Sequence, residues 1–283
     1  MRNIFKYLLV LTLLSLAFLL WRQVFYLEKT ALEFYVLDVG QGDAIFIETP
    51  SKNQILIDGG PDRSVLKELG EVMPFWDRTI DLVILTHPNL DHVAGLVEVL
   101  KNYKVERLID TEDNYYLAEY EELKKIASEK NIKRLIARRG LKVILDPGVE
   151  LMVLHPDSLV GGDPNYNSLI AKLSFGETNF LLTGDAEKGE ELKLVANGDD
   201  LESEVLKVGH HGSKTSSNPL FLEKVKPQYA LISVGRQNRY GHPNNEVLDA
   251  LAAAGAKIFR TDTDSRLWIH SDGENFTVEA KGL

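Results

Sequence analysis

The sequence predicts an α/β domain in which two β-sheets pack face to face and helices cover the outside. Three observations favour this class. Short β-prone segments gather in an early and a late block, helical segments lie among them, and no composition shift or Pro-rich linker follows residue 30. Because strands and helices both have to bury an apolar face, two sheets covered by helices satisfy the whole set. We therefore predict one domain over residues 31–283.

The early block begins with a strand whose apolar residues alternate, followed by a tight turn with two glycines at 39–43. The apolar spacing then distinguishes strands, with a period of two, from amphipathic helices. Asp58-Gly59-Gly60-Pro61 ends one strand abruptly. The expected strands are 32–38, 44–48, 54–57, 81–86, 106–109, 132–137, 142–145 and 150–154, and the expected helices are 64–72, 93–102 and 117–129.

The late block follows a polar loop, 157–167, that is rich in glycine and proline. We predict that its first two strands form a hairpin around Gly176-Glu177, a typical turn sequence. Three short strands end the chain. The other expected strands are 168–175, 179–183, 203–208 and 229–234, and the expected helices are 186–196, 217–225 and 244–254.

The N-terminal residues 1–30 differ from the rest. Arg2 and Lys6 precede an apolar run, 7–21, that approaches the roughly 20 residues needed to cross a bilayer when Ile4 and Phe5 are added. No small-residue cleavage pattern follows, so we predict an uncleaved signal anchor, a single transmembrane helix. Positive charge at its start places the globular domain outside the cytoplasm. A buried helix is the alternative, but no face of the segment is polar.

Composition limits the chemistry of any site. The chain of 283 residues has no cysteine, so thiolate zinc sites and disulfides are excluded, and a metal has to be held by His, Asp, Glu or Asn. The formal net charge of −10 argues against a protein that coats nucleic acid. A local basic patch can still meet a phosphate backbone near the site, and its candidates are Lys207, Lys214, Arg236 and Arg239.

The stretch 86–92 carries the strongest chemical signal. His87, Asp91 and His92 lie in a short turn between a buried strand and a helix, and imidazole and carboxylate are ligands for divalent ions. One such match can arise by chance, but similar residues recur after other strands. These are Asp58, the 165–168 loop, Asp185, the pair His210-His211, and His242. Where strands are parallel neighbours, their carboxyl ends open on one edge, so we expect these loops to converge.

These motifs resemble a known family. His87-x-Asn89-x-Asp91-His92, followed by Asp185 and His210, is similar to the metallo-β-lactamase fold of binuclear hydrolases, which implies a four-layer αββα sandwich. Finer motifs resemble the nuclease-like domain of the ComEC competence (DNA-uptake) family, over roughly residues 32–281. These are the segments 37–44, 165–169, 182–187, 206–213 and 240–243. The large membrane channel of full ComEC proteins has no counterpart here.

The resemblance implies two divalent ions, Mn²⁺ or Zn²⁺, and a set of ligands. They are His87, Asn89, Asp91, His92, Asp185 and His210. The family pattern is His-x-His-x-Asp-His, so Asn89 replaces a histidine, and Asn167 and Ser168 occupy the region of another missing one. One subsite therefore loses two imidazoles, and an oxygen-rich site favours Mn²⁺ over Zn²⁺.

Roles follow for the remaining candidates. The ions would activate water and polarise a phosphoryl oxygen, Asp91 would orient or deprotonate that water, and His211 and His242 would donate to phosphate or protonate the leaving oxygen. Asp58 either holds the histidine loop by hydrogen bonds or ligates metal directly. We expect five residues to contact substrate: Asp43, Asn167, Ser168, Ser213 and Lys214. For Ser213 helix capping is an alternative, and for Asp43 a purely backbone turn.

Three functions remain open from the sequence. The first is a membrane-anchored phosphodiesterase or nuclease that acts on DNA during uptake, with a separate membrane channel protein as possible partner. The second is a hydrolase of another small-molecule or envelope phosphodiester or ester, since one fold hosts many chemistries. The third is a weakened metal-binding module. Asn89 favours the third, whereas Asp185 and His210 argue against it.

Overall fold

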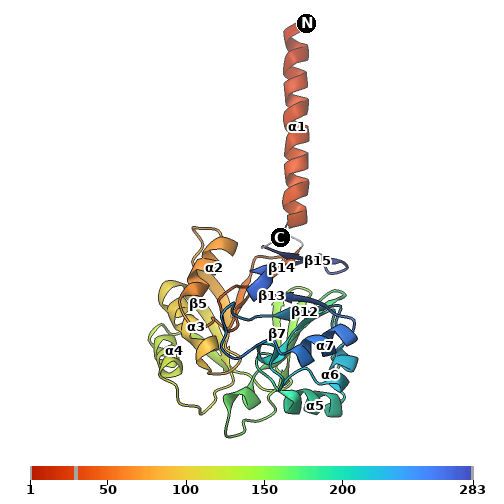
Figure 1. Ribbon diagram of the computed structural model, residues 1–283. Coiled ribbons are helices and arrows are strands. Elements are labelled where there is room, and N and C mark those ends of the chain that lie inside the picture. The colour runs from red at the N-terminus through yellow and green to blue at the C-terminus, as the bar shows by residue number, and fades with distance from the viewer. Residues whose placement is uncertain (1, 29–30, 282–283) are drawn as a thin grey trace.

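The chain folds around two mixed β-sheets, as the computed structural model shows for residues 2–28 and 31–281 (Figure 1). Within these residues the sheets have eight and seven strands, in the orders β15-β14-β1-β2-β3-β4-β5-β6 and β13-β12-β11-β10-β9-β8-β7. The first sheet contains β1 (Leu32–Val36), β2 (Ile45–Glu48), β3 (Gln54–Ile57), β4 (Thr79–Ile84), β5 (Lys104–Asp110), β6 (Lys133–Ile136), β14 (Leu267–Ser271) and β15 (Phe276–Ala280). The second contains β7 (Lys142–Asp146), β8 (Val149–His155), β9 (Ile170–Phe175), β10 (Thr178–Leu182), β11 (Val205–Lys207), β12 (Tyr229–Ile232) and β13 (Lys257–Arg260).

Helices cover the outer face of each sheet and complete four layers. Buried apolar residues join the first sheet to α2 (Ser64–Val72), α3 (Leu90–Asn102) and α4 (Ala118–Glu129). A second buried cluster joins the other sheet to α5 (Lys188–Asn197), α6 (Pro219–Val225) and α7 (Asn245–Ala253). The short α8 (Thr261–Asp264) follows β13. The predicted αββα sandwich is therefore confirmed.

The inner faces of the two sheets form a third apolar cluster. At its centre the ring of Phe34 in β1 stacks on that of Phe180 in β10, with 4.6 Å between the ring centroids. Burying each of these side chains stabilises the fold by about 1.5–3 kcal/mol. The cluster holds the loops of the two sheets in register at their common edge.

The last two strands do not join the late block to which the sequence order assigned them. Strand β14 pairs antiparallel with β1, with Leu267 opposite Val36, and β15 pairs with β14. Leu267 and Ile269 thereby enter the core between the sheets. The end of the chain thus extends the first sheet, because β1 offers a free edge and the alternating side chains of β14 bury one face.

The N-terminal segment requires a correction. Helix α1 (Arg2–Glu28) projects away from the sandwich in Figure 1, but within residues 2–28 and 31–281 no helix is long and apolar enough to cross a membrane. Lys6 and Arg22 bound the apolar run, so it rises only about 22 Å, whereas the hydrocarbon core is about 30 Å thick. The predicted transmembrane helix is wrong, and the single-pass location with an extracytoplasmic domain is withdrawn with it.

The predicted division of the chain after residue 30 stays a prediction, because residues 29 and 30 lie outside the described ranges.

The ends of the parallel strands converge at one edge of the sandwich. Strands β3, β4 and β5 run parallel, and so do β10, β11 and β12. Their carboxyl ends carry Asp58, the 86–92 turn, Asp185 and the 209–212 turn. The parallel strands thus bring these loops together at one edge, as predicted.

Candidate metal centre

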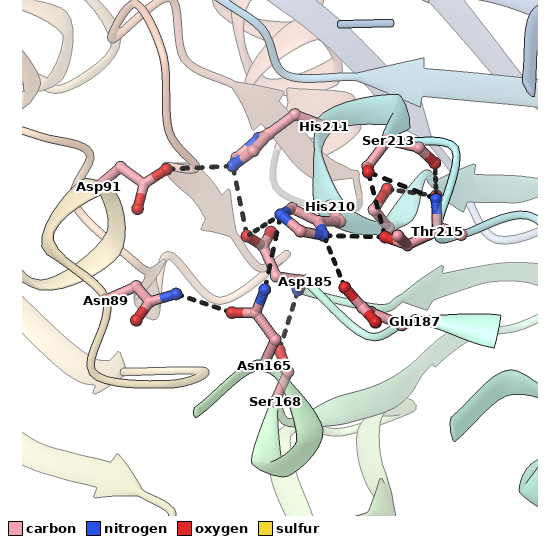
Figure 2. A network of polar contacts seen from close by, with 12 residues as sticks. Asn89, Asp91, Asn165, Ser168, Asp185, Glu187, His210, His211, Ser213 and Thr215 are labelled. Carbon is pink, nitrogen blue, oxygen red and sulfur yellow. Dashed lines mark hydrogen bonds and ion pairs between the residues drawn. The ribbon is translucent and has the colours of Figure 1, made fainter. Parts of the chain in front are cut away.

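Asp185 lies at the middle of a buried cluster of ligand-type side chains. Its Oδ2 atom is 3.3 Å from His92 Nε2 and 3.5 Å from His211 Nε2. His211 Nε2 also lies 3.3 Å from Asp91 Oδ2 (Figure 2). One ligand atom from each of these four residues falls within 4.8 Å of the others, so they can share a metal ion. We call Asp91, His92 and His211 the His92 half of the centre.

The turn after β4 is held by a carboxylate from the turn after β3. Asp58 accepts hydrogen bonds from the Thr86 amide (2.8 Å) and hydroxyl (2.7 Å), and His92 Nδ1 lies 2.8 Å from its Oδ2. A carboxylate on Nδ1 fixes the orientation of the ring and leaves Nε2 free for a metal. Asp58 also belongs to a second group with Asp43 and His92 that is compact enough for an ion. Its hydrogen bonds fit the supporting role better than a direct one.

The turn after β11 holds two histidines in an unusual backbone. Within the 3₁₀ turn η2 (Gly209–Gly212), His210 has φ 47° and His211 has φ 54°. Left-handed conformations cost a non-glycine residue about 1–3 kcal/mol and often mark functional sites. His211 turns inward, where its Nδ1 lies 2.9 Å from the Ser233 carbonyl, while the His210 side chain stays 24% exposed.

The positions of His210 and His211 differ from those that their predicted roles require. The sequence assigned metal ligation to His210 and proton transfer to His211, but His211 lies in the compact cluster. His210 Nε2 is 3.9 Å from Asp185 Oδ2, and its Nδ1 lies 3.2 Å from Thr215 Oγ1 and 3.3 Å from Glu187 Oε1. We therefore assign His211 to the His92 half and place His210 at the mouth of the centre.

Unpaired atoms test whether this site suits a metal. Among the residues that the structure describes, the Nε2 atoms of His87, His92 and His211 and Oδ1 of Asp185 are buried without a hydrogen-bond partner. An unpaired buried polar atom costs about 1–3 kcal/mol, so such groups normally have partners. Here the three ring nitrogens all face the same carboxylate. A divalent cation bound beside Asp185 would satisfy them together.

The electrostatics agree with that fit. Although burial opposes the charge, Asp185 and its neighbouring carboxylates raise the pKa of both His92 and His211 well above the usual range. Burial likewise opposes ionisation of Asp185, but His211 and His92 hold its pKa well below the usual range. Protons on the two histidines thus balance the buried carboxylates, and a cation can replace them.

The residues on the other side of Asp185 include no second carboxylate and their histidines lie farther from Asp185, and we call His87, Asn89, Asn165 and His210 the His87 half. His87 is fully buried, and its Nε2 lies 3.8 Å from Asp185 Oδ2. Asn89 Nδ2 donates to Asn165 Oδ1 at 2.7 Å, and Asn165 Nδ2 lies 3.5 Å from His210 Nε2 (Figure 2). Burial and the neighbouring His92 lower the pKa of His87 to about 3, so its ring is neutral.

Three polar residues predicted to contact substrate have different hydrogen-bond partners. Ser168 Oγ accepts from the Asp185 amide at 2.9 Å and supports the centre from within. Asn167 bonds instead to Asp113 and to both backbone groups of Val160, so it orders its own loop. Ser213 Oγ accepts from Thr215 in a local turn, whereas α6 is capped by Asn218, so the capping alternative for Ser213 is wrong.

One predicted group, His242, lies at the mouth of the centre. The His242 ring is 5.9 Å from that of His210, and Tyr240 stacks on it at 5.8 Å. Burial and the two neighbouring histidines, His210 and His211, lower the pKa of His242, which favours a neutral ring. Lys214 is exposed nearby in the chain, on the loop that follows η2. His242 can therefore reach a substrate from the solvent side, and a contact between Lys214 and substrate stays a prediction.

Two predictions about charged residues were wrong. Lys207 is fully buried and cannot belong to a basic surface patch. Its Nζ lies 2.8 Å from Asp43 Oδ2, and Asp43 is itself only 2% exposed. Asp43 therefore does not face substrate, and it lies behind His211 with its Oδ1 3.3 Å from Nδ1. The tight turn before it needs glycine, because a Cβ on Gly42 would meet the Asp91 carbonyl at 2.2 Å.

Sequence reasoning missed three residues around His210. Asn165, Glu187 and Thr215 all contact its ring. Asn165 and Glu187 stood in the recognised segments 165–169 and 182–187, whereas Thr215 carried no signal beyond its closeness to His211.

Comparison with known proteins agrees with this geometry. The family described as "Metallo-beta-lactamase superfamily" matches residues 37–236. ComE operon protein 3 of Bacillus subtilis is 32% identical over 252 residues, which cover 83% of this chain and 32% of that protein. Competence protein ComA of Neisseria gonorrhoeae is 31% identical over 238 residues, covering 82% of this chain and 31% of that protein. The chain thus spans about a third of these relatives.

A solved structure shows the same fold at lower identity. Igni18, a metallo hydrolase from Ignicoccus hospitalis, superimposes with a TM-score of 0.55 at 16% identity, over 83% of this chain and 98% of that one. Together these matches confirm the family predicted from the motifs and the kinship with competence proteins.

Proposed function

The chain belongs to the metallo-β-lactamase superfamily, and from that premise we propose that it is a metal-dependent phosphodiesterase that cleaves DNA in a competence-like role. The observation that carries the proposal is the convergence of Asp91, His92 and His211 on Asp185, with unpaired ring nitrogens facing that carboxylate. The kinship with a protein named for competence supports DNA as the substrate.

The residues divide the work by position. A divalent ion held by Asp91, His92, Asp185 and His211 would lower the pKa of a water molecule and polarise a phosphoryl oxygen. The Asp91 side chain is 31% exposed, so one carboxylate can face the cluster and also orient water from solvent. His210 and His242 lie together at the mouth, where ring N–H groups can donate hydrogen bonds to phosphate oxygens.

A second candidate is a metal-binding module without hydrolytic activity. One observation favours it: Asn89 occupies the position of a histidine in the family pattern, and its side chain is hydrogen-bonded to Asn165. Such a site would hold one ion firmly in the His92 half. It would lack the second ion that clamps the leaving oxygen in two-metal hydrolysis.

One assay separates these functions. The full chain, its Asp91→Ala variant and an Asp249→Asn control are incubated with single- and double-stranded DNA and either Mn²⁺ or Zn²⁺. Asp249 is an exposed carboxylate on α7, away from the cluster. We expect metal-dependent cleavage by wild type and control, and at least about a 100-fold loss for Asp91→Ala, since even residues behind the ligands cost 10–100-fold.

The opposite outcomes are equally clear. Equal, metal-independent background from all three proteins would contradict the phosphodiesterase. Tight Mn²⁺ binding by the wild type without cleavage of either DNA would instead favour the binding module.

A further inference from the structure

Lys207 is a lysine in a place where lysines are rarely found. It ends β11 and pairs with Leu182 on one side and Leu231 on the other. Both leucines, and Val205 on the same face of β11, belong to the apolar cluster between the sheets. Its side chain is 1% exposed. An ammonium group buried among such neighbours is costly unless it is paired.

Its partner comes from the opposite sheet. Lys207 Nζ lies 2.8 Å from Asp43 Oδ2 and donates to the Val208 carbonyl at 3.0 Å. Asp43 belongs to the turn between β1 and β2, and its backbone amide donates to the Asp91 carbonyl at 3.2 Å. The ion pair thus connects the two sheets directly below the residues that converge on Asp185.

The second oxygen of Asp43 faces a metal-type histidine. Asp43 Oδ1 lies 3.3 Å from His211 Nδ1, which also meets the Ser233 carbonyl at 2.9 Å. The Ser233 carbonyl is the hydrogen-bond acceptor of Nδ1 and the Asp43 carboxylate lies beside it, which leaves Nε2, pointing to Asp91 and Asp185, as the nitrogen that a metal can bind. The geometry of Asp43 therefore bears on the orientation of His211.

Asp43 could also compete with Asp185 for a cation. Together with Asp58 and His92 it forms a group compact enough to hold a cation. With the ammonium of Lys207 beside it, that group already contains a positive charge from the chain itself. Without the ammonium, Asp43 would be a buried carboxylate free to turn toward His92 or to bind a cation away from Asp185.

We propose that Lys207 is a positioning residue of the metal centre: its ammonium fixes Asp43, and Asp43 orients His211 for metal binding. This inference rests on the metal-binding part of the proposed function and not on its substrate. It assigns Lys207 no contact with metal or DNA. A purely structural lysine would affect the stability of the fold alone.

The test measures Mn²⁺ affinity by calorimetry on the full chain, beside thermal unfolding of the metal-free protein. Lys207→Met keeps most of the apolar part of the side chain and removes the ammonium group, and Lys224→Met on the exposed face of α6 is the control. We expect Lys207→Met to bind Mn²⁺ about 10–100-fold more weakly, as for other residues behind metal ligands, and Lys224→Met to match wild type.

Two further variants keep the test decisive if Lys207→Met folds poorly. Asp43→Asn leaves Lys207 in place and should weaken Mn²⁺ binding at least about tenfold, because the charge behind His211 is lost. In the double variant the loss should be no larger than that of the worse single variant, since both act through one contact. Wild-type affinity in folded Lys207→Met or Asp43→Asn, or losses that simply add, would overturn the proposal.

The outcomes also separate this inference from the DNA-cleaving function. Wild type that binds Mn²⁺ but cleaves no DNA contradicts that function, while a loss of affinity in Lys207→Met still supports the positioning role. Wild type that binds no divalent ion would overturn both.

Discussion

The two halves of the centre share Asp185 but are supported differently. In the His92 half, the Nδ1 atoms of His92 and His211 face a carboxylate and a carbonyl, from Asp58 and Ser233. In the His87 half, the only partners near His87 Nδ1 among the described residues are the hydroxyls of Thr86 and Ser168, at 3.0 and 3.4 Å. Strong acceptors fix a ring for metal binding better than hydroxyls that can rotate. We infer that the His92 half binds an ion more tightly than the His87 half.

The largest effect should come from the residue that both halves share. Replacing Asp185 by Asn removes the charge around which all four ligand-type histidines gather. We expect Mn²⁺ affinity to fall at least about 100-fold, beyond the loss typical of residues behind the ligands. Calorimetric titration measures it, with Asp249→Asn as control. Retained tight binding would show that the two halves do not meet at Asp185.

The adjacent histidines offer the sharpest test of the comparison. His211→Ala should weaken Mn²⁺ binding about 100-fold, whereas His210→Ala should cost less than about tenfold, because His210 is partly exposed and farther from Asp185. The two variants are matched in size and position. If His210→Ala gave the larger loss, the assignment of the inward histidine would be wrong.

Acidity should weaken metal binding in the His92 half and have little effect at His87. Against the effect of burial, Asp185 raises the pKa of His92 and His211, so a metal has to displace protons there. Burial and His92 lower the pKa of His87 to about 3, so no proton competes at that ring near neutral pH. Mn²⁺ affinity of the His92 half should therefore rise with pH, by up to about tenfold per unit for each displaced proton.

Calorimetry in buffers of different ionisation enthalpy counts the released protons. Affinity that stays constant between pH 6 and pH 8 (about a 100-fold range in proton concentration), with no proton release, would contradict this account of the His92 half.

The smallest expected effect comes from restoring an imidazole to the His87 half. Asn89→His adds a nitrogen beside His87 but breaks the hydrogen bond to Asn165. We expect a second ion to bind about tenfold more tightly, a gain of about 1.4 kcal/mol. Asn89→Ala breaks the same hydrogen bond without adding a ligand and serves as the control. Equal second-site affinity in both variants would mean that the missing histidine does not limit this half.

The parts of the site that sequence could predict are those set by local pattern. Asp58, the 86–92 turn and Asp185 each follow an apolar strand, and parallel neighbours bring such ends together. The choice between His210 and His211 could not be predicted, because both lie in one glycine-bounded turn. It depends on Ser233 and Asp43, which lie in loops next to β12 and β2.

The position of the charged residue Lys207 could not be predicted from local sequence either. A lysine is expected at the surface, but the alternation of side chains along β11 places Lys207 on the same inward face as Val205. There its ammonium group pairs with the carboxylate of Asp43, next to a strand of the other sheet. The placement of β14 beside β1 likewise depended on a free sheet edge that sequence order does not reveal. At the N-terminus, the apolar run suggested a transmembrane helix, a prediction that the bounding charges of Lys6 and Arg22 should have weakened.

The most direct test is anomalous X-ray scattering from crystals of the full chain grown with Mn²⁺. We predict the strongest Mn peak within coordination distance of Asp91, His92, Asp185 and His211, with any second peak weaker and nearer His87. A single strong peak coordinated by His87 and His210, with His92 and His211 unligated, would contradict the assignment of the two halves.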